Sequence, residues 1–219
     1  MPKIVDHDER RREVLSAAGR VIVRDGIDAA TTRAIAKEAG YSNGVLAHYF
    51  ADKDEILLSA LRQSHQRIRA RLTGKVTGAV TGAVTGAGGP GGSALAALRE
   101  LLLDNLPLDD ERARETRLEV SFWSRSLASE RLAEVQRAEA DELRAAVRDL
   151  LGRARTAGEL RNSAAPDHTT EPSGTEELDD LTEHLLALMD GLSLHVLLYP
   201  ERLTRADAER VMLRALDRL

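Results

Sequence analysis

The feature that most constrains the fold is residues 31–50, TTRAIAKEAGYSNGVLAHYF, which form two short amphipathic segments around a tight Gly-Tyr-Ser turn. Thr31 can cap a first helix with an inward-facing Ile35, and Gly40 tolerates the left-handed conformation at that helix's C-terminal end. Ser42 can then cap a second helix. The pattern predicts a helix-turn-helix, the arrangement that lays its second helix in a DNA major groove.

The second predicted helix has one buried face and one exposed face. Leu46 and Phe50 lie four residues apart and are expected to pack against the first helix. The outward positions are Gly44, Val45, Ala47 and His48. Three of these four side chains are small, and residues 42–50 contain no Lys, Arg, Asp or Glu, so the helix can approach a groove closely. The alternative is an ordinary helical hairpin within an all-helical core.

The surrounding sequence, from about residue 14 to residue 58, resembles the DNA-binding domain of the TetR family of bacterial one-component regulators. The matching positions are Val14, Leu15, Ala17, Ala18, Gly26, Thr31, Ile35, Ala36, Gly44, Leu46, Tyr49, Phe50 and Lys53. The sequence departs from the family pattern at Gly19 and Ile22, where larger apolar residues are usual. It also has Ala47 where the family commonly has a tyrosine that contacts phosphate, which puts one backbone contact in doubt.

Together, the pattern and the resemblance predict nine DNA-binding residues, eight of which fall into two groups. Thr32, Arg33, Tyr49 and Lys53 are expected at phosphates, and Asn43, Gly44, Val45 and His48 at bases. The full predicted set is Thr32, Arg33, Ser42, Asn43, Gly44, Val45, His48, Tyr49 and Lys53.

The fold class predicted for the whole chain is all-α, with a DNA-binding domain at residues 1–52 and a helical domain for effector binding and dimerisation at residues 53–219. Asp52 and Glu55 have the spacing of a capping box for a fourth helix. Flexible loops are expected at residues 73–92, where periodic glycines disfavour a helix, and near residues 162–177, which are polar. Apolar residues spaced three and four apart predict helices elsewhere.

The last two predicted helices are strongly apolar, the first running from a cap at Thr175 to Pro200 and the second opening at Thr204. Two such helices per chain suit a four-helix bundle across a two-fold axis. The C-terminal sequence resembles the BetI-type branch of the TetR family, which dimerises in this way. A homodimer is therefore expected.

Charge is divided unevenly along the chain, whose net charge is −5. Residues 1–72 carry 13 Lys and Arg against 10 Asp and Glu, whereas the remaining residues carry 18 against 26. The basic part is the predicted DNA-binding part, although a solvated basic face would give the same balance. The chain has no Cys, and the sequence offers neither a signal peptide nor an uninterrupted apolar run of about 20 residues, so a cytoplasmic protein without a membrane span is expected.

An enzyme is the competing class, but the usual motifs are missing. The six His are scattered, and no HExxH, Gly-x-Ser-x-Gly or P-loop sequence is present. Residues 86–91, GAGGPG, match the spacing of a dinucleotide fingerprint but lack the preceding strand. Asp180, His184 and His195 would make only a weak metal group. No cofactor, metal or catalytic residue is predicted, and the large acidic domain disfavours a purely architectural DNA binder.

The resemblance also implies a small-molecule site among the later helices. Its candidate wall is Leu102, Leu106, Leu118, Phe122, Trp123, Met189, Leu192 and His195. Such apolar residues equally suit a plain core. Glu119 and Asp190 would permit a cationic effector, but the sequence does not identify the molecule. The resulting hypothesis is a homodimeric repressor that a small molecule releases from a palindromic double-stranded DNA operator.

Overall fold

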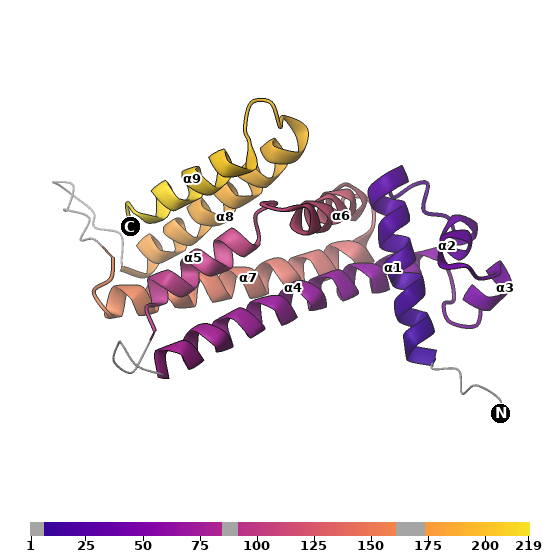
Figure 1. Ribbon diagram of the computed structural model, residues 1–219, viewed down its shortest axis with the longest axis horizontal. Coiled ribbons are helices and arrows are strands. Elements are labelled where there is room, and N and C mark those ends of the chain that lie inside the picture. The colour runs from indigo at the N-terminus through magenta and orange to yellow at the C-terminus, as the bar shows by residue number, and fades with distance from the viewer. Residues whose placement is uncertain (1–6, 85–91, 161–173) are drawn as a thin grey trace. The chain divides into compact units, whose positions relative to one another are not determined.

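The computed structural model describes residues 7–84, 92–160 and 174–219, and at residues 72–84 and 174 it describes the backbone alone. All regular secondary structure in these residues is α-helical, which confirms the predicted fold class (Figure 1). The helices are α1 His7–Asp25, α2 Thr32–Ala39, α3 Asn43–Leu46, α4 Lys53–Val84, α5 Ala94–Asp104, α6 Asp110–Ser126, α7 Glu130–Thr156, α8 Gly174–Leu198 and α9 Arg205–Leu216.

These helices form two compact units. The first unit comprises Met1–Ile68 and Arg117–Ala138, and the second comprises Arg69–Thr116 and Glu139–Leu219. Helices α4, α6 and α7 each begin in one unit and end in the other. The functional boundary that the sequence predicts between residues 52 and 53 stays a prediction.

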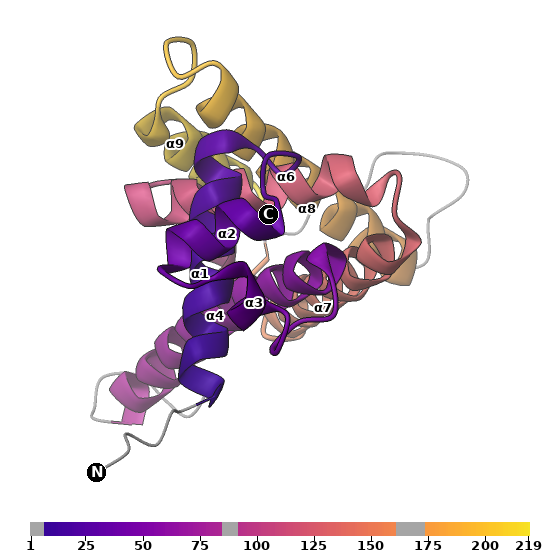
Figure 2. The same cartoon turned by 90° about the vertical axis from the view of Figure 1, so that its right-hand side faces the viewer.

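The first unit has its own apolar core, to which all its segments contribute. Helix α1 packs against α2, and α2 packs against α3, as the two views of α1 to α3 show (Figures 1 and 2). The largest fully buried side chains of this core are Ile22, Ile35, Ile56, Leu57, Leu61 and Phe122. The core therefore fixes the short helices α2 and α3 on a base made of longer ones.

In the second unit, α9 runs beside α8 and is also in contact with α5 (Figure 1). Its fully buried large side chains are Leu98, Leu102, Leu106, Leu151, Leu185 and Met212. Glu159, just after α7, accepts hydrogen bonds from the main-chain N–H of Ala94 at 3.3 Å and of Leu95 at 2.8 Å, so the chain after α7 caps the start of α5.

The prediction of a loop at residues 73–92 is wrong for residues 73–84. Helix α4 runs for 32 residues and continues to Val84, through Gly74, Gly78 and Gly82. Each glycine costs a helix interior only about 1 kcal/mol relative to alanine, and no proline interrupts the sequence before Pro90. Residues 85–91 lie outside the described residues. The second predicted loop lies largely there too, at residues 161–173, but its last residues, 174–177, belong to α8.

Helix α8 tests the expectation of a chain without a membrane span. In the described part of the chain, Thr175–Leu198 is the one segment long and apolar enough to cross a membrane by length and composition. Its carboxylate Asp179 forms ion pairs with Arg148 at 2.6 Å and Arg144 at 3.3 Å, both on α7. These arginines lower the pKa of Asp179, chiefly through the hydrogen bond from Arg148. A core helix of a globular unit has the same composition, so α8 is weak evidence for a span.

Candidate nucleic-acid interface

Helix α2 begins and ends at the residues that the sequence predicts. Thr31 is the N-cap, and its hydroxyl oxygen accepts a hydrogen bond from the N–H of Ala34 at 3.2 Å. Gly40 ends the helix with φ of 74°, in the left-handed region that favours glycine. Ile35 and Ala36 are buried. These caps fix the direction in which the chain leaves α2.

Helix α3, the predicted reading helix, starts at a second cap. The hydroxyl of Ser42 accepts from the N–H of Val45 at 3.3 Å. The α-helix itself ends at Leu46, earlier than the predicted helix through Phe50, and the chain continues in hydrogen-bonded turns. In these turns the N–H of His48 reaches the carbonyl of Val45 at 3.1 Å, and the N–H of Phe50 reaches that of Leu46 at 3.0 Å. Leu46 and Phe50 are buried, which confirms the predicted inward face.

The predicted outward face is exposed except at Val45. Asn43, Gly44, Ala47 and His48 are all exposed, whereas Val45 is half-buried. Val45 does not belong to the apolar residues packed against the core of the first unit. This surface is uncharged, and a neighbouring molecule could reach it.

Gly44 has no evident role within the protein. A Cβ atom added at this position would meet only the Ser42 hydroxyl, at 3.8 Å, and the residue does not have a positive φ. Alanine would favour the helix, so the fold gives no reason for glycine here. A close approach by another molecule would give one.

The predicted phosphate contacts differ in their surroundings. Arg33 is exposed and Thr32 half-buried, both in the first turn of α2, where main-chain N–H groups lack helical acceptors. Tyr49 is half-buried and packs against the core, with its ring 5.5 Å from the ring of His7. Lys53 is half-buried, and its Nζ lies 3.4 Å from the carbonyl oxygens of Ile27 and Asp28. Lys53 therefore also holds the loop after α1.

The start of α4 is capped close to the prediction. Asp52 Oδ1 accepts from the N–H of Glu55 at 2.7 Å, as in a capping box. The reciprocal bond is shifted by one residue, because Glu55 Oε2 accepts from the N–H of Ala51, at 2.6 Å, instead of that of Asp52. The Ala51 N–H, and after it the Arg11 guanidinium, lower the pKa of Glu55. Nothing in the sequence indicated a role for Arg11.

The eight predicted effector residues are divided between the two units. Leu102, Leu106, Met189 and Leu192 belong to the core of the second unit, and Leu118 and Phe122 to the core of the first. Trp123 is half-buried and His195 is exposed, with its ring edge-on to Tyr199 at 5.4 Å. Their role as one wall stays a prediction.

A groove on the first unit lies elsewhere, between α1 and the C-terminal end of α2. It is lined by Glu9, Arg12, Glu13, Ser16, Arg20, Ala39, Gly40 and Tyr41, a mixed and mostly polar set without any predicted effector residue. In the part of the chain that the structure describes, no three His, Asp or Glu side chains are grouped to hold a metal ion.

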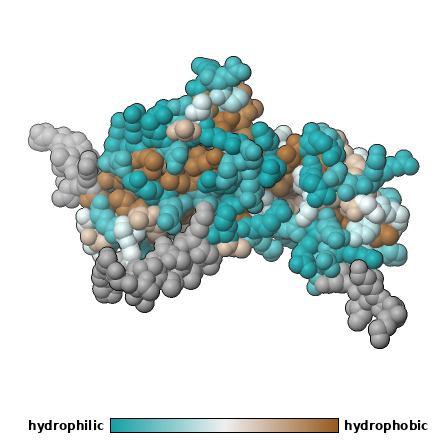
Figure 3. All heavy atoms as spheres, viewed as in Figure 1, coloured by the Kyte–Doolittle hydropathy of each residue, from teal (hydrophilic) through white to brown (hydrophobic). Residues whose placement is uncertain are grey.

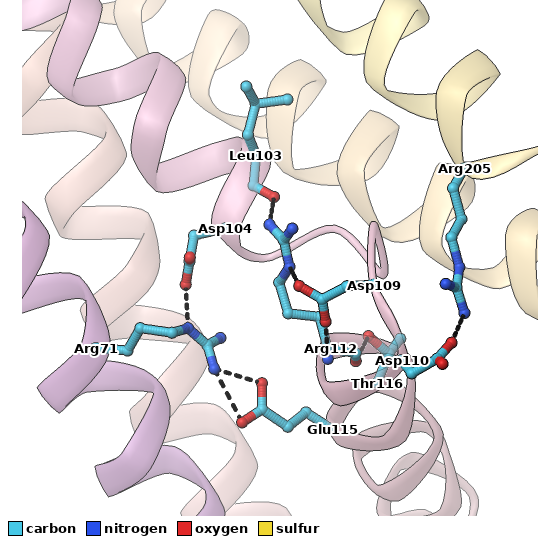
Figure 4. Close-up of polar contacts among 9 residues, drawn as sticks. All are labelled: Arg71, Leu103, Asp104, Asp109, Asp110, Arg112, Glu115, Thr116 and Arg205. Atoms are coloured by element: carbon cyan, nitrogen blue, oxygen red, sulfur yellow. Dashed lines mark hydrogen bonds and ion pairs between the residues drawn. The ribbon is translucent and has the colours of Figure 1, made fainter.

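The second unit contains a cluster of charged side chains with little exposure, which we call the Arg71 cluster: Arg71, Asp104 and Glu115 (Figure 4). Arg71 Nε donates to Asp104 at 2.7 Å, and its Nη1 donates to both Glu115 oxygens at 2.9 and 3.0 Å. The Asp104 side chain is 1% exposed. Burial acts to lower the pKa of Arg71, but the hydrogen bonds to Asp104 and Glu115 outweigh it and raise that pKa. Three helices, α4, α5 and α6, are linked here.

A capped helix-turn-helix on one unit, together with a second, wholly helical unit, defines a class of bacterial DNA-binding regulator. Comparison with known families agrees: residues 14–60 match the bacterial regulatory proteins of the tetR family, and residues 94–219 match the C-terminal domain of BetI-type transcriptional repressors. The chain belongs to the TetR family and is a transcriptional regulator of the TetR/BetI type. Its relatives are regulators and not enzymes.

Individual relatives span most of the chain. The transcriptional regulator PksA of Bacillus subtilis (strain 168) is 29% identical over 217 residues, covering 99% of this chain and 93% of PksA. A transcriptional regulator of known structure from Rhodococcus sp. Rha1 is 26% identical with a TM-score of 0.73, covering 94% of each chain. A regulator from Saccharomonospora viridis, solved in complex with choline, is 23% identical with a TM-score of 0.78, covering 96% of each chain.

Proposed function

We propose that the protein is a cytoplasmic transcriptional repressor that binds a palindromic operator as a homodimer and is released from it by a small molecule. The observation that carries the DNA-binding part is the uncharged outward surface of the capped reading segment, on which Asn43, Gly44, Ala47 and His48 are exposed. Its small residues leave room for base edges, and the exposed Arg33 at the start of α2 can meet a phosphate.

Selection from a pool of random duplex DNA tests this proposal. We expect the protein to enrich a sequence with two-fold symmetry, with half-sites centred roughly 34 Å or a multiple of it apart. Failure to enrich any sequence, or enrichment of one half-site without symmetry, would contradict the proposal.

Two variants then separate base reading from phosphate contact. Val45→Asn should change the preference at one base pair per half-site by roughly 1–3 kcal/mol and leave the salt dependence unchanged. Arg33→Gln should weaken binding to all sequences alike and lower the salt slope by about 1. Arg33 is preferable to Lys53 here, because Lys53 also contacts the loop carbonyls of Ile27 and Asp28. If Val45→Asn instead weakens binding to all sequences equally and lowers the melting temperature, Val45 stabilises the fold and does not contact a base.

The proposed dimer interface lies on α8 and α9. Hydrophobic side chains show on the surface of the second unit over α8 (Figure 3), and Leu198 is 61% exposed. Gly191 and Leu194, on the same helix, are half-buried. Because Gly191 lies three residues before Leu194, and Leu194 four residues before Leu198, the three residues share one face of the helix. A second copy covering this face would bury apolar area that one chain leaves in contact with solvent.

The structure also shows which substitutions can test the dimer. Leu192 and Leu216 are 7% and 1% exposed within one chain, so a charge there would disrupt the core of the second unit. Leu194→Glu and Leu198→Glu should instead give folded monomers in sedimentation velocity. A dimer that persists in both variants would move the interface elsewhere.

A quaternary ammonium compound is the first effector class to test. The Saccharomonospora viridis regulator holds choline, and in this chain the indole of Trp123 donates to Glu119 at 3.3 Å, placing an aromatic ring beside a carboxylate. Such a pair can attract a cation. Choline should change the emission of Trp123, the single tryptophan, and release the selected duplex. If choline releases the duplex while the emission stays constant, Trp123 is not part of the effector site. If choline neither releases the duplex nor changes the emission, it is excluded as the effector.

A further inference from the structure

Arg11 on α1 contacts the chain immediately after the reading helix. Its Nη1 donates to the main-chain carbonyl of Tyr49 at 2.6 Å, and its Cζ lies 4.3 Å from the ring centroid of Phe50. Its Nη2 donates to Glu55 Oε1 and to Ser59 Oγ, each at 3.2 Å. One guanidinium therefore joins α1, the end of the reading segment and α4.

Glu55 completes this arrangement from the other side. While one of its oxygens accepts from Arg11, the other accepts from the main-chain N–H of Ala51, at 2.6 Å. The carbonyl of Tyr49 and the N–H of Ala51 are thus held by the two partners of one ion pair. Phe50 lies between them, 4% exposed, under the guanidinium. The main chain at residues 49–51 is fixed from α1 and α4 together.

We propose that Arg11 is a positioning residue for DNA reading, which sets the place of the reading helix and of Tyr49 without contacting a base itself. This inference rests on the proposed function, because it assumes that residues 43–49 meet DNA. Helix α3 has only four residues, Asn43–Leu46, so the position of its outward face depends on the Ser42 cap, on the buried Leu46 and on the polar contacts that follow its C-terminal end. Arg11 supplies those contacts.

The neighbouring arginines do not share this role, although residues 10–12 are all Arg. Arg12 is exposed and donates its Nε to the carbonyl of Asp8 in its own helix, at 3.2 Å. Arg10 lies over Tyr41, with its Cζ 5.7 Å from the ring centroid. Arg12 therefore provides a matched control with the same charge one residue away.

The geometry also requires arginine in particular. A planar guanidinium can lie over an aromatic ring while its N–H groups donate in several directions within its plane, which a lysine ammonium cannot do. Arg11→Lys therefore keeps the charge but removes the planar group that can donate in several directions. A role in simple attraction of DNA predicts that lysine suffices, whereas a positioning role predicts that it fails.

The experiment compares Arg11→Lys, Arg11→Gln and Arg12→Gln on the duplex selected by the wild-type protein and on an unrelated duplex. Arg12→Gln should leave the ratio of the two affinities unchanged. Both Arg11 variants should lower this ratio roughly tenfold, the equivalent of about one base contact, and Arg11→Lys should retain the wild-type salt slope. A wild-type ratio in Arg11→Lys, or equal ratios in Arg11→Gln and Arg12→Gln, would overturn the inference.

Hydrogen exchange in the free protein gives a readout independent of DNA. In Arg11→Lys the amides of residues 49–51 should exchange faster, while those of α2 stay protected as in the wild type. Unchanged exchange at residues 49–51 would overturn the inference. If the Arg11 variants fail to fold, Glu55→Gln, which weakens the same ion pair, must lower the affinity ratio for the inference to stand. A wild-type protein that selects no duplex would refute the proposed function, and the inference with it.

Discussion

The turn segment, residues 31–55, and the Arg71 cluster are both stabilised by hydrogen-bonded polar side chains, but over very different distances along the chain. In the turn segment the caps join residues three apart: Thr31 with Ala34, Ser42 with Val45, and Asp52 with Glu55. In the Arg71 cluster the partners lie 33 and 44 residues apart. The caps restrict the local path of the main chain, whereas the cluster joins whole helices.

This difference has an energetic counterpart. A cap satisfies an N–H at a helix end that water could otherwise reach, so its loss has a moderate cost. The carboxylate of Asp104 is 1% exposed, and its loss leaves a half-buried guanidinium, 24% exposed, with one carboxylate partner fewer. Removing one member of a buried pair is expected to cost more than the pair itself contributes.

The largest expected effect is therefore on the Arg71 cluster. Asp104→Asn should lower the free energy of unfolding by about 3 kcal/mol, because Arg71 keeps only Glu115 as a charged partner in the cluster. Asp110→Asn is the control, since Asp110 is 81% exposed in its pair with Arg205 and its loss should cost far less than the loss of Asp104. Urea denaturation measures both, and similar costs would remove the distinction between cluster and surface pair. The double variant Arg71→Met/Asp104→Leu should recover much of the loss.

Replacing each of two glycines of the turn segment with alanine should change stability by a smaller amount, and in opposite directions. Gly40→Ala should destabilise the protein by about 1–2 kcal/mol, because φ of 74° strains any residue with a Cβ. Gly44→Ala should leave stability unchanged or raise it by up to about 1 kcal/mol, yet weaken binding to the selected duplex. Thermal unfolding and DNA titration test the pair. If Gly44→Ala binds DNA as the wild type does, Gly44 does not face it closely.

The smallest effect tests whether caps behave alike in both units. Thr204 caps α9, with Asp207 completing a capping box, and Thr204→Ala should cost about 1 kcal/mol. Hydrogen bonds from Thr204, then from Arg210, lower the pKa of Asp207 from 3.8 to about 2. The stabilisation is therefore present above about pH 4 and is lost as the pH falls through the folded-state value of about 2. The free energy of unfolding, measured by denaturation, should differ less between pH 7 and pH 2 in Thr204→Ala than in the wild type.

The sequence predicted features whose cause is local. Thr31, Gly40, Ser42 and Thr204 were all identified from residue type and spacing, and the structure confirms each as a cap. The helix through Gly74, Gly78 and Gly82 was missed because glycine weakens a helix without ending it, as proline does.

Contacts between distant segments could not be predicted in this way. Arg11 reaches the Tyr49 carbonyl across 38 residues, and nothing in the run of arginines at residues 10–12 distinguishes it from its neighbours. The same holds for Leu192 and Leu216, whose spacing indicates an apolar face but not whether their own chain or a second copy covers it. Burial within one chain answered that question.

The composition of the first unit limits how this protein can be recombined with its relatives. Its core includes Leu118, Phe122 and Leu132, which the gene encodes far downstream of the reading helix. A fragment ending at residue 68 would lack these three members of its core and would tend to aggregate, because the rest of the core would be left partly uncovered. A chimaera with a new DNA specificity therefore needs two inserted gene segments, or a single exchange confined to surface positions of residues 31–50. Point mutations in the reading helix are accordingly the easier route by which such a regulator acquires a new operator.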